Sequence, residues 1–190
     1  MSDSQISMSQ VGSFNPNASE SITNIFNSAA PTRMSAYYRQ LHQEILDKTT
    51  RDVLDDLLYY YTKQYDAKGV EEKLQDSGFT ARSICVAMHQ KQQFAKKASQ
   101  FDFYPAAQEI NLLFFTDIIS AFSVYVAPMI ENELSVNAVM ECIHEKVVLP
   151  IMAKINENGE YDLDLHYTTD HIYGMIYFLT DMCHLNWKKE

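Results

Sequence analysis

The stretch Asp170-His-Ile-Tyr-Gly-Met-Ile-Tyr-Phe-Leu-Thr-Asp-Met-Cys-His-Leu-Asn-Trp187 decides the fold of this chain. It predicts a helix with apolar side chains on nearly every face, and a helix that is apolar all round is buried. Thr168 or Thr169 can cap its start, with Asp170 in the first turn, where the helix dipole favours a negative charge. The chain therefore ends in its own core or in a partner.

Two residues of this stretch predict close packing. A glycine in a helix interior costs roughly 1 kcal/mol relative to alanine, and that cost is tolerable where another backbone approaches closely. We therefore expect a helix crossing at Gly174. Trp187, the only tryptophan, is expected to be either a lid on the core of this chain or an anchor in a partner's pocket, because its large ring suits both roles.

Helical periodicity continues through most of the chain. From Pro31 onward, apolar residues recur at three- and four-residue steps, which predicts an all-α domain over residues 31–190. We expect a compact bundle of about six to eight helices with the C-terminal helix buried. The expected segments are a first helix around 34–46, then 53–65, 70–75, 80–100, 106–127, 136–149 and 151–155.

Local signals refine these segments. Thr49 followed by Asp52 fits an N-cap and its capping partner at the start of the second helix. Pro128 is expected to start or kink a new segment, and Pro150 is expected to end or bend the helix before it. The inner face of the long apolar helix is expected to carry Ile110, Leu113, Phe114, Ile118, Ala121, Phe122 and Tyr125.

Residues 1–30 differ in composition from the rest of the chain. They hold eight serines, two acidic residues and no lysine or arginine. Polar segments of this kind favour disorder. The alternative is a pair of short strands, 5–11 and 20–26, that order against a partner's sheet edge. We therefore treat residues 1–30 as a separate unit, either a disordered tail or a strand pair.

A run of three tyrosines, Tyr59-Tyr60-Tyr61, lies in the second expected helix. Three consecutive residues cover a whole helical turn, so at least one ring must face away from the core. Tyrosine is enriched in protein–protein interfaces. The run therefore predicts an interaction surface.

The sequence contains no pattern typical of catalysis or metal binding. Cys142-x-His144 and Cys183-His184 contain four zinc-binding residue types, but helical neighbours one or two positions apart point to different faces. The three cysteines lie in apolar periodic stretches, which predicts reduced core thiols and a cytoplasmic protein. No nucleophile elbow, phosphate-binding loop or metalloprotease motif is present. We expect no catalytic residue, no metal and no cofactor.

The formal net charge of −10 argues against nucleic-acid binding by this chain alone. Binding to duplex phosphates needs a concentrated basic surface. The candidates are Lys91, Lys96 and Lys97, with Arg82 upstream, and we expect them to form a solvated helix face. No membrane span is expected, because polar residues interrupt the most apolar stretch, 110–127, before it reaches ~18–20 apolar residues.

The terminal segment resembles the closing motif of a known family of domains. Thr169 to Thr180, followed by Cys183-His184-Leu185-x-Trp187, is similar to the end of the C-terminal domain of ABC-three-component systems, the Lamassu-type bacterial anti-phage defence systems. Earlier segments agree with this resemblance over roughly residues 33–187. They are Leu54-Asp55-Asp56-Leu57-x-Tyr59-Tyr60-x-Thr62, Val70-Glu71-Glu72-Lys73-Leu74, Phe94-Ala95-Lys96-Lys97 and Glu145-Lys146-Val147-Val148-Leu149-Pro150-Ile151.

The resemblance implies a helical module that docks an effector onto an SMC-like ABC ATPase and a small middle subunit. The effector, often a nuclease, lies N-terminal to such a module, whereas here only the polar residues 1–30 precede it, too few for a nuclease domain. We therefore expect a non-enzymatic docking subunit, with a separate effector chain or a second copy of this chain as further candidate partners. No catalytic residue carries over from the family. The residues expected at interfaces are Tyr59, Tyr60, Gly174, Tyr177, His184 and Trp187.

Two alternatives remain open at the level of sequence. The chain could be a small non-catalytic effector or toxin that acts on membranes through the 106–127 helix. Asp117 argues against this, since a charge at bilayer depth is costly. We expect Asp117 to pair with a tyrosine or histidine, because a buried carboxylate needs a partner. The second alternative is a subunit that contributes to a composite nuclease site.

Overall fold

The computed structural model describes residues 32–65 and 68–188. The expectations for residues 1–30 lie outside this part of the chain. The helices of the described residues are α1 (Arg33–Asp47), α2 (Asp55–Tyr61), α3 (Val70–Asp76), α4 (Ala81–Phe101), α5 (Pro105–Ala121), α6 (Ala127–Glu131), α7 (Val136–Ile143), α8 (Leu149–Glu157) and α9 (Thr169–Asp181). No described residue lies in a strand, and the predicted all-α bundle is confirmed.

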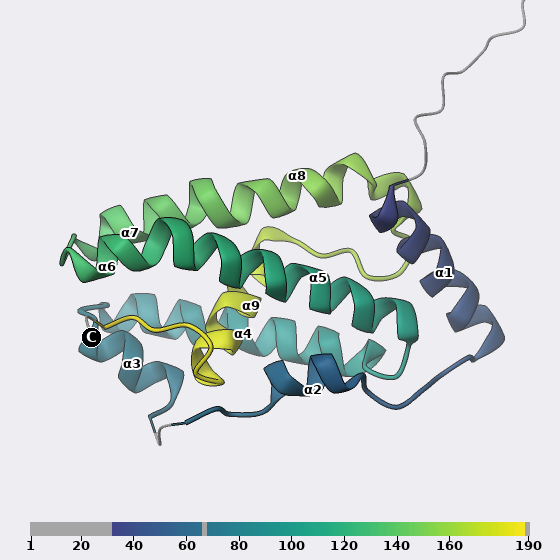
Figure 1. The fold of residues 1–190 in the computed structure, drawn as a ribbon, viewed down its shortest axis with the longest axis horizontal. Coiled ribbons are helices and arrows are strands. Elements are labelled where there is room, and N and C mark those ends of the chain that lie inside the picture. The colour runs from purple at the N-terminus through teal and green to yellow at the C-terminus, as the bar shows by residue number, and fades with distance from the viewer. Residues whose placement is uncertain (1–31, 66–67, 189–190) are drawn as a thin grey trace, which may run out of the picture. The chain divides into compact units, whose positions relative to one another are not determined.

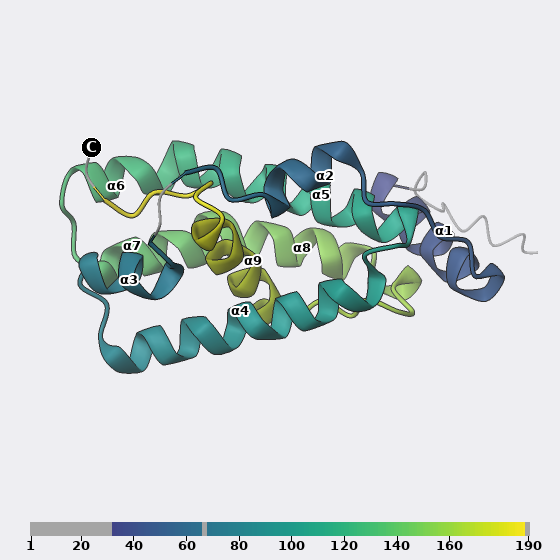
Figure 2. The same cartoon turned by 90° about the horizontal axis from the view of Figure 1, so that it is seen from below.

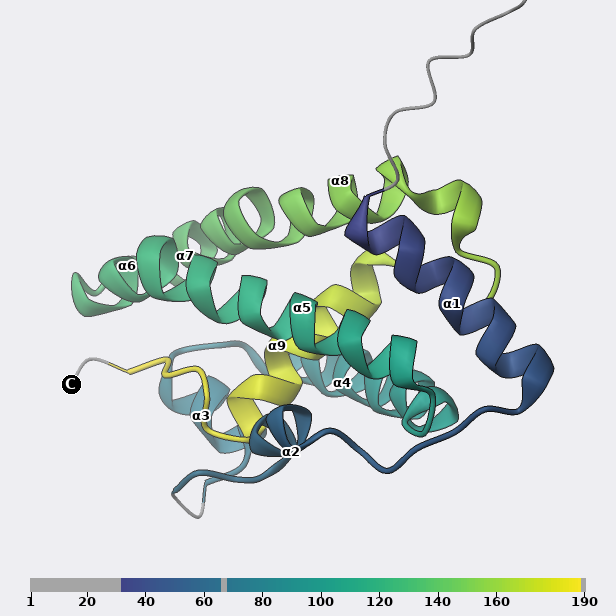
Figure 3. The same ribbon diagram turned by 45° about the vertical axis from the view of Figure 1, so that its right-hand side comes forward.

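Two long helical rods lie side by side and form one layer of the domain. The first joins α5 to α6 and the second joins α7 to α8 (Figure 1). The other layer contains α4, and α9 crosses obliquely between α4 and the rods (Figure 2). Figure 3 follows α9 from the ends of α8 and α1 to the loop beside α2 and α3. The last helix is therefore surrounded by the others, as its apolar faces predict.

The prolines within the rods do not end their helices. A π-helical turn, Phe122–Val126, joins α5 to α6, and a second one, His144–Val148, joins α7 to α8. In each case the backbone N–H just after the π turn donates to the carbonyl five residues earlier. Pro128 and Pro150 each follow their π turn by two residues, and the wider turn relieves the clash of a proline ring with the carbonyl four residues back. The sequence left open whether Pro150 ends or bends its helix, and in the structure the helix continues through it.

The first π turn also changes which residues face inward. Tyr125 was expected on the inner face of the long helix, but its side chain is 50% exposed. Val126 is buried in its place, one wide turn after Phe122. The extra residue in a π turn rotates the helix face, and a prediction that assumes a constant period cannot include this rotation.

The crossing of α9 over α4 is close, as the glycine predicted. A Cβ atom built at Gly174 meets the backbone carbonyl oxygen of Gln90 at 2.3 Å and the Cβ of Phe94 at 2.7 Å. Three phenylalanine rings pack against one another next to the crossing, with ring centroids 5.5–5.9 Å apart. They belong to Phe94 of α4, Phe115 of α5 and Phe178 of α9. The missing side chain thus lets two helix backbones meet at the centre of the core.

The second helix starts later than the sequence predicted. Thr49 does not cap it; the N-cap residue is Leu54, without a side-chain hydrogen bond. Instead, the buried amide of Gln108 on α5 accepts a hydrogen bond from the Leu54 N–H at 3.1 Å and donates to the carbonyl of Asp52 at 3.2 Å. A distant side chain therefore satisfies the entry to α2 in place of a local cap.

The long apolar helix has two features that differ from the expectations. The continuous helix Pro105–Glu131, 27 residues long, is long and apolar enough to cross a membrane by length and composition, although a core helix meets the same test. In this fold it buries Ile110, Phe114 and Ile118. Asp117 is half-buried and pairs with Lys154 of α8 at 2.7 Å, so the expected tyrosine or histidine partner was wrong.

Candidate docking site

The chain turns sharply at the end of α9. Cys183 adopts a left-handed backbone with φ 65°, and the His184 N–H donates to the carbonyl of Leu179 at 2.9 Å. This is the hydrogen-bonding pattern of a Schellman turn, which satisfies the last carbonyls of a helix. The stretch predicted as a helix included His184, but the helix ends at Asp181 and His184 lies beyond it, in this turn.

Trp187 returns to the core after the turn. Its indole Nε1 donates to Thr180 Oγ1 at 2.8 Å, and only 4% of the residue is exposed. Phe79 and Phe122 contact the indole edge-on, with ring centroids 5.3 and 5.6 Å away. Of the two sequence alternatives, the structure places Trp187 as a lid on the core of this chain.

The tyrosines of α2 lie next to the terminal turn. The imidazole of His184 packs against the rings of both Tyr59 and Tyr60, with centroids 5.0 and 5.2 Å away. Tyr59 is 55% exposed and Tyr65, just after the helix, is 66% exposed. Tyr61 points inward and donates to Asp102 at 3.0 Å. The prediction that one ring of the run faces away from the core is confirmed.

These side chains enclose a surface hollow of about 380 Å³, which we call the tyrosine pocket. It is lined by Tyr59, Tyr60, Gln64, Tyr65, Ile119, Cys183 and His184. The buried Nε2 of His184 makes no hydrogen bond with a described residue. Burial lowers the pKa of His184, which favours the neutral imidazole. The pocket is thus lined mainly by aromatic rings, those of three tyrosines and His184.

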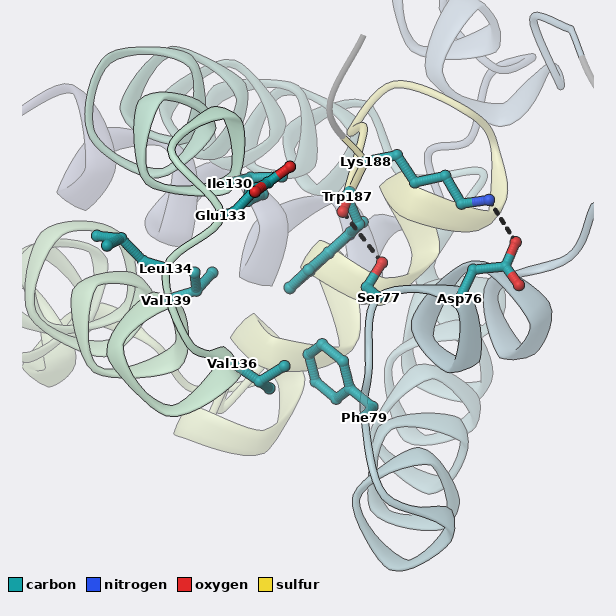
Figure 4. A pocket seen from close by; sticks show the side chains of 10 residues that line it. All are labelled: Asp76, Ser77, Phe79, Ile130, Glu133, Leu134, Val136, Val139, Trp187 and Lys188. Carbon is teal, nitrogen blue, oxygen red and sulfur yellow. Dashed lines mark hydrogen bonds and ion pairs between the residues drawn. The ribbon is translucent and has the colours of Figure 1, made fainter.

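A second hollow of about 500 Å³ lies beside the chain end (Figure 4). Phe79, Val136 and Trp187 form its apolar floor. Along one edge Lys188 pairs with Asp76, and Ser77 Oγ donates to the Trp187 carbonyl at 3.0 Å. The residues on this edge already bind one another, so the edge joins the terminal segment to the end of α3.

The predicted interface residues therefore separate into two groups. Tyr59, Tyr60 and His184 line the tyrosine pocket. Gly174, Tyr177 and Trp187 are buried in the domain. The sequence missed Tyr65 and Ile119, which also line the pocket, because the expected second helix ran to residue 65 and gave no sign that the chain leaves it at Thr62.

The described residues offer no cluster of three or more His, Cys, Asp or Glu side chains that could hold a metal. The three cysteines are free and differ in environment. Cys183 is buried and receives a hydrogen bond from Lys73 Nζ at 3.0 Å. Burial raises the pKa of the half-buried Cys142 thiol. Cys85 is exposed on α4, so the expectation that all three are core thiols was wrong.

Comparisons with known proteins agree with the resemblance in the terminal segment. The model of C-terminal domain 9 of the ABC-three component (ABC-3C) systems matches residues 69–187, from the start of α3 to Trp187. No curated protein and no solved structure matches the chain. The match covers more than half of the 190 residues and includes α9 with its crossing glycine. The chain belongs to the family of C-terminal domain 9 of ABC-three-component systems.

Proposed function

We propose that this chain is a non-enzymatic docking subunit of a bacterial defence complex of the Lamassu type. It would hold an SMC-like ABC ATPase and a small middle subunit together in the cytoplasm. Membership of the ABC-three-component family supports a role within a multi-subunit system. The observation that carries the docking role is the tyrosine pocket, where the exposed rings of Tyr59 and Tyr65 border a hollow that is also lined by His184.

The chemistry of the pocket suits a protein partner. Tyrosine rings supply large contact area at low cost in side-chain entropy, and aromatic residues dominate the energetics of interfaces. A partner that covers the rim removes water from Tyr59 and Tyr65.

The buried members of the predicted interface have a positioning role in this proposal. Trp187 holds the terminal turn against Thr180, and this turn carries His184 into the pocket. Gly174 sets the distance between α9 and α4. These buried residues hold the backbone that carries the exposed pocket residues. Their replacement is therefore expected to affect folding as well as binding.

The test is co-purification of the full chain with the ATPase and middle subunits encoded beside it. We expect the wild-type chain to be retained, and Tyr59→Ala with His184→Ala to reduce retention strongly. Tyr125→Ala is the matched control, because Tyr125 is a similarly exposed tyrosine outside the pocket. A wild-type chain that is a compact monomer and retains neither subunit would refute the proposal. Nuclease activity that appears only in the reconstituted complex, and is lost with His184→Ala, would favour a composite site.

A membrane-acting effector is the second candidate, because the helix Pro105–Glu131 has the length and composition of a span. Its pairing of Asp117 with Lys154 and its buried aromatic contacts favour a core helix instead. Flotation of the purified chain with liposomes separates the two candidates. Co-migration with vesicles would favour the effector and count against docking.

A further inference from the structure

We infer that the tyrosine pocket receives a basic amphipathic helix from a partner subunit, with an apolar anchor in the pocket and a lysine or arginine one turn away. This inference rests on the proposed docking function and adds the chemistry of the partner. The lysine or arginine would meet Asp55 and Asp56, the two carboxylates at the start of α2.

The two carboxylates and the two tyrosines stand one helical turn apart. Asp55 precedes Tyr59 by four residues, and Asp56 precedes Tyr60 by the same step. Residues four apart lie on the same side of a helix, with Cβ atoms about 5–6 Å apart. Leu57 and Tyr61 face the core, and Tyr60 packs partly against Phe115. The outer face of α2 therefore presents two acids at one end and the exposed ring of Tyr59 at the other.

The carboxylates at this end of α2 are not neutralised by the described part of the chain. Asp55 and Asp56 are exposed and make no ion pair or hydrogen bond with a described residue. Arg51, the cation just before them in the chain, instead pairs with Glu109 at 3.5 Å. Lys63, the next cation after them, donates to the carbonyl of Lys68 at 3.1 Å. The complement of this surface is therefore cationic.

The spacing favours a helical partner segment. An amphipathic helix recognises a surface through anchors three and four residues apart, the same spacing that separates the acids of α2 from its tyrosines. An extended strand would need an exposed sheet edge, and the described residues include no strand. A guanidinium or ammonium group can also lie over the exposed ring of Tyr59, where a cation–π contact adds to the charge pairing.

The experiment measures the affinity of the full chain for the co-purified ATPase and middle subunits at low and high ionic strength. Asp55→Asn with Asp56→Asn removes the charges and keeps the shape. Glu71→Gln with Glu72→Gln is the matched control, because these two acids occupy the first turn of α3 and are also exposed. Tyr59→Ala tests the apolar anchor, with Tyr125→Ala as its control.

We expect the asparagine pair to weaken binding several-fold at low ionic strength and less at high ionic strength, because salt screens exposed charge pairs. Tyr59→Ala should weaken binding at both. If the wild-type chain binds but the asparagine pair matches it at low ionic strength, the basic-helix inference fails while docking stands. If the wild-type chain binds neither subunit, the docking function itself fails.

Hydrogen exchange of the complex identifies the partner segment directly. We expect protection of residues 55–65 and 183–185 on this chain, together with one helical segment on the partner that has net positive charge. Protection of these residues together with an acidic or uncharged partner segment would overturn the inference. So would a complex in which residues 55–65 exchange as fast as in the free chain.

Discussion

Tyr59 and Trp187 are both large aromatic residues in short segments near the surface, yet their environments are opposite. Trp187 is 4% exposed and its indole donates to Thr180, whereas Tyr59 is 55% exposed and lies against a hollow. The family match includes Trp187 and ends there, and it begins after α2. The tryptophan therefore belongs to the domain core, whereas the tyrosine lies outside the matched residues and is exposed to solvent.

The largest expected effect is at Trp187. Trp187→Ala removes the contacts with Phe79 and Phe122 and leaves Thr180 Oγ1 without its donor. Truncation of a buried tryptophan costs about 3–5 kcal/mol. Urea denaturation should show a loss of this size in the free energy of unfolding. A loss below about 1 kcal/mol would mean that the ring is not part of the core.

The helix crossing should give the next largest effect. Gly174→Ala places a methyl group 2.3 Å from the carbonyl oxygen of Gln90, so α4 and α9 must separate. Overpacking typically costs about 1–3 kcal/mol, and a rigid backbone contact belongs at the upper end. Gly159→Ala is the matched control, since its Cβ would have no neighbour within 4 Å. Equal stability of the two variants by urea denaturation would contradict the close crossing.

A smaller effect is expected from pH at the end of α9. Burial raises the pKa of Asp181, but the hydrogen bond and charge of Lys91 and the Val70 N–H outweigh it and lower the pKa below its ordinary value of 3.8. A carboxyl whose folded pKa is lowered stabilises the fold above its unfolded pKa and loses that contribution as the pH falls. Stability should therefore drop as the pH falls below about 4. Asp181→Asn should flatten this part of the stability profile; an unchanged profile would exclude Asp181 as its source.

Tyr59 should have the smallest effect on stability. Tyr59→Ala removes an exposed ring whose contacts are Tyr60 and His184, so the free energy of unfolding should change by less than about 1 kcal/mol. Partner binding should nevertheless fall. Thermal unfolding and co-purification on the same preparation measure both. If Tyr59→Ala lowered the free energy of unfolding as much as Trp187→Ala does, Tyr59 would also be part of the core, and the proposed difference between the two residues would be wrong.

Much of the helical pattern could be predicted from local signals. Thr168 is the N-cap residue of α9, one of the two threonines that the sequence offered, and the short helix expected at 70–75 is α3, which ends one residue later. The start of α2 was predicted wrongly, because its stabilising partner is Gln108, more than fifty residues away. The π turns were also missed, since the sequence periodicity contains no separate signal for the extra residue of a wide turn.

The sequence by itself determined the all-helical fold, the burial of α9 and the crossing at Gly174, because apolar periodicity and a glycine in a helix interior have direct physical consequences. Only the tertiary structure decided that Trp187 covers this chain's own core and that His184 meets the tyrosines of α2. Both depend on the direction in which the chain turns after α9. That direction is fixed by the left-handed backbone at Cys183 and by its hydrogen bonds with Tyr65 and Lys73, residues far away in the sequence.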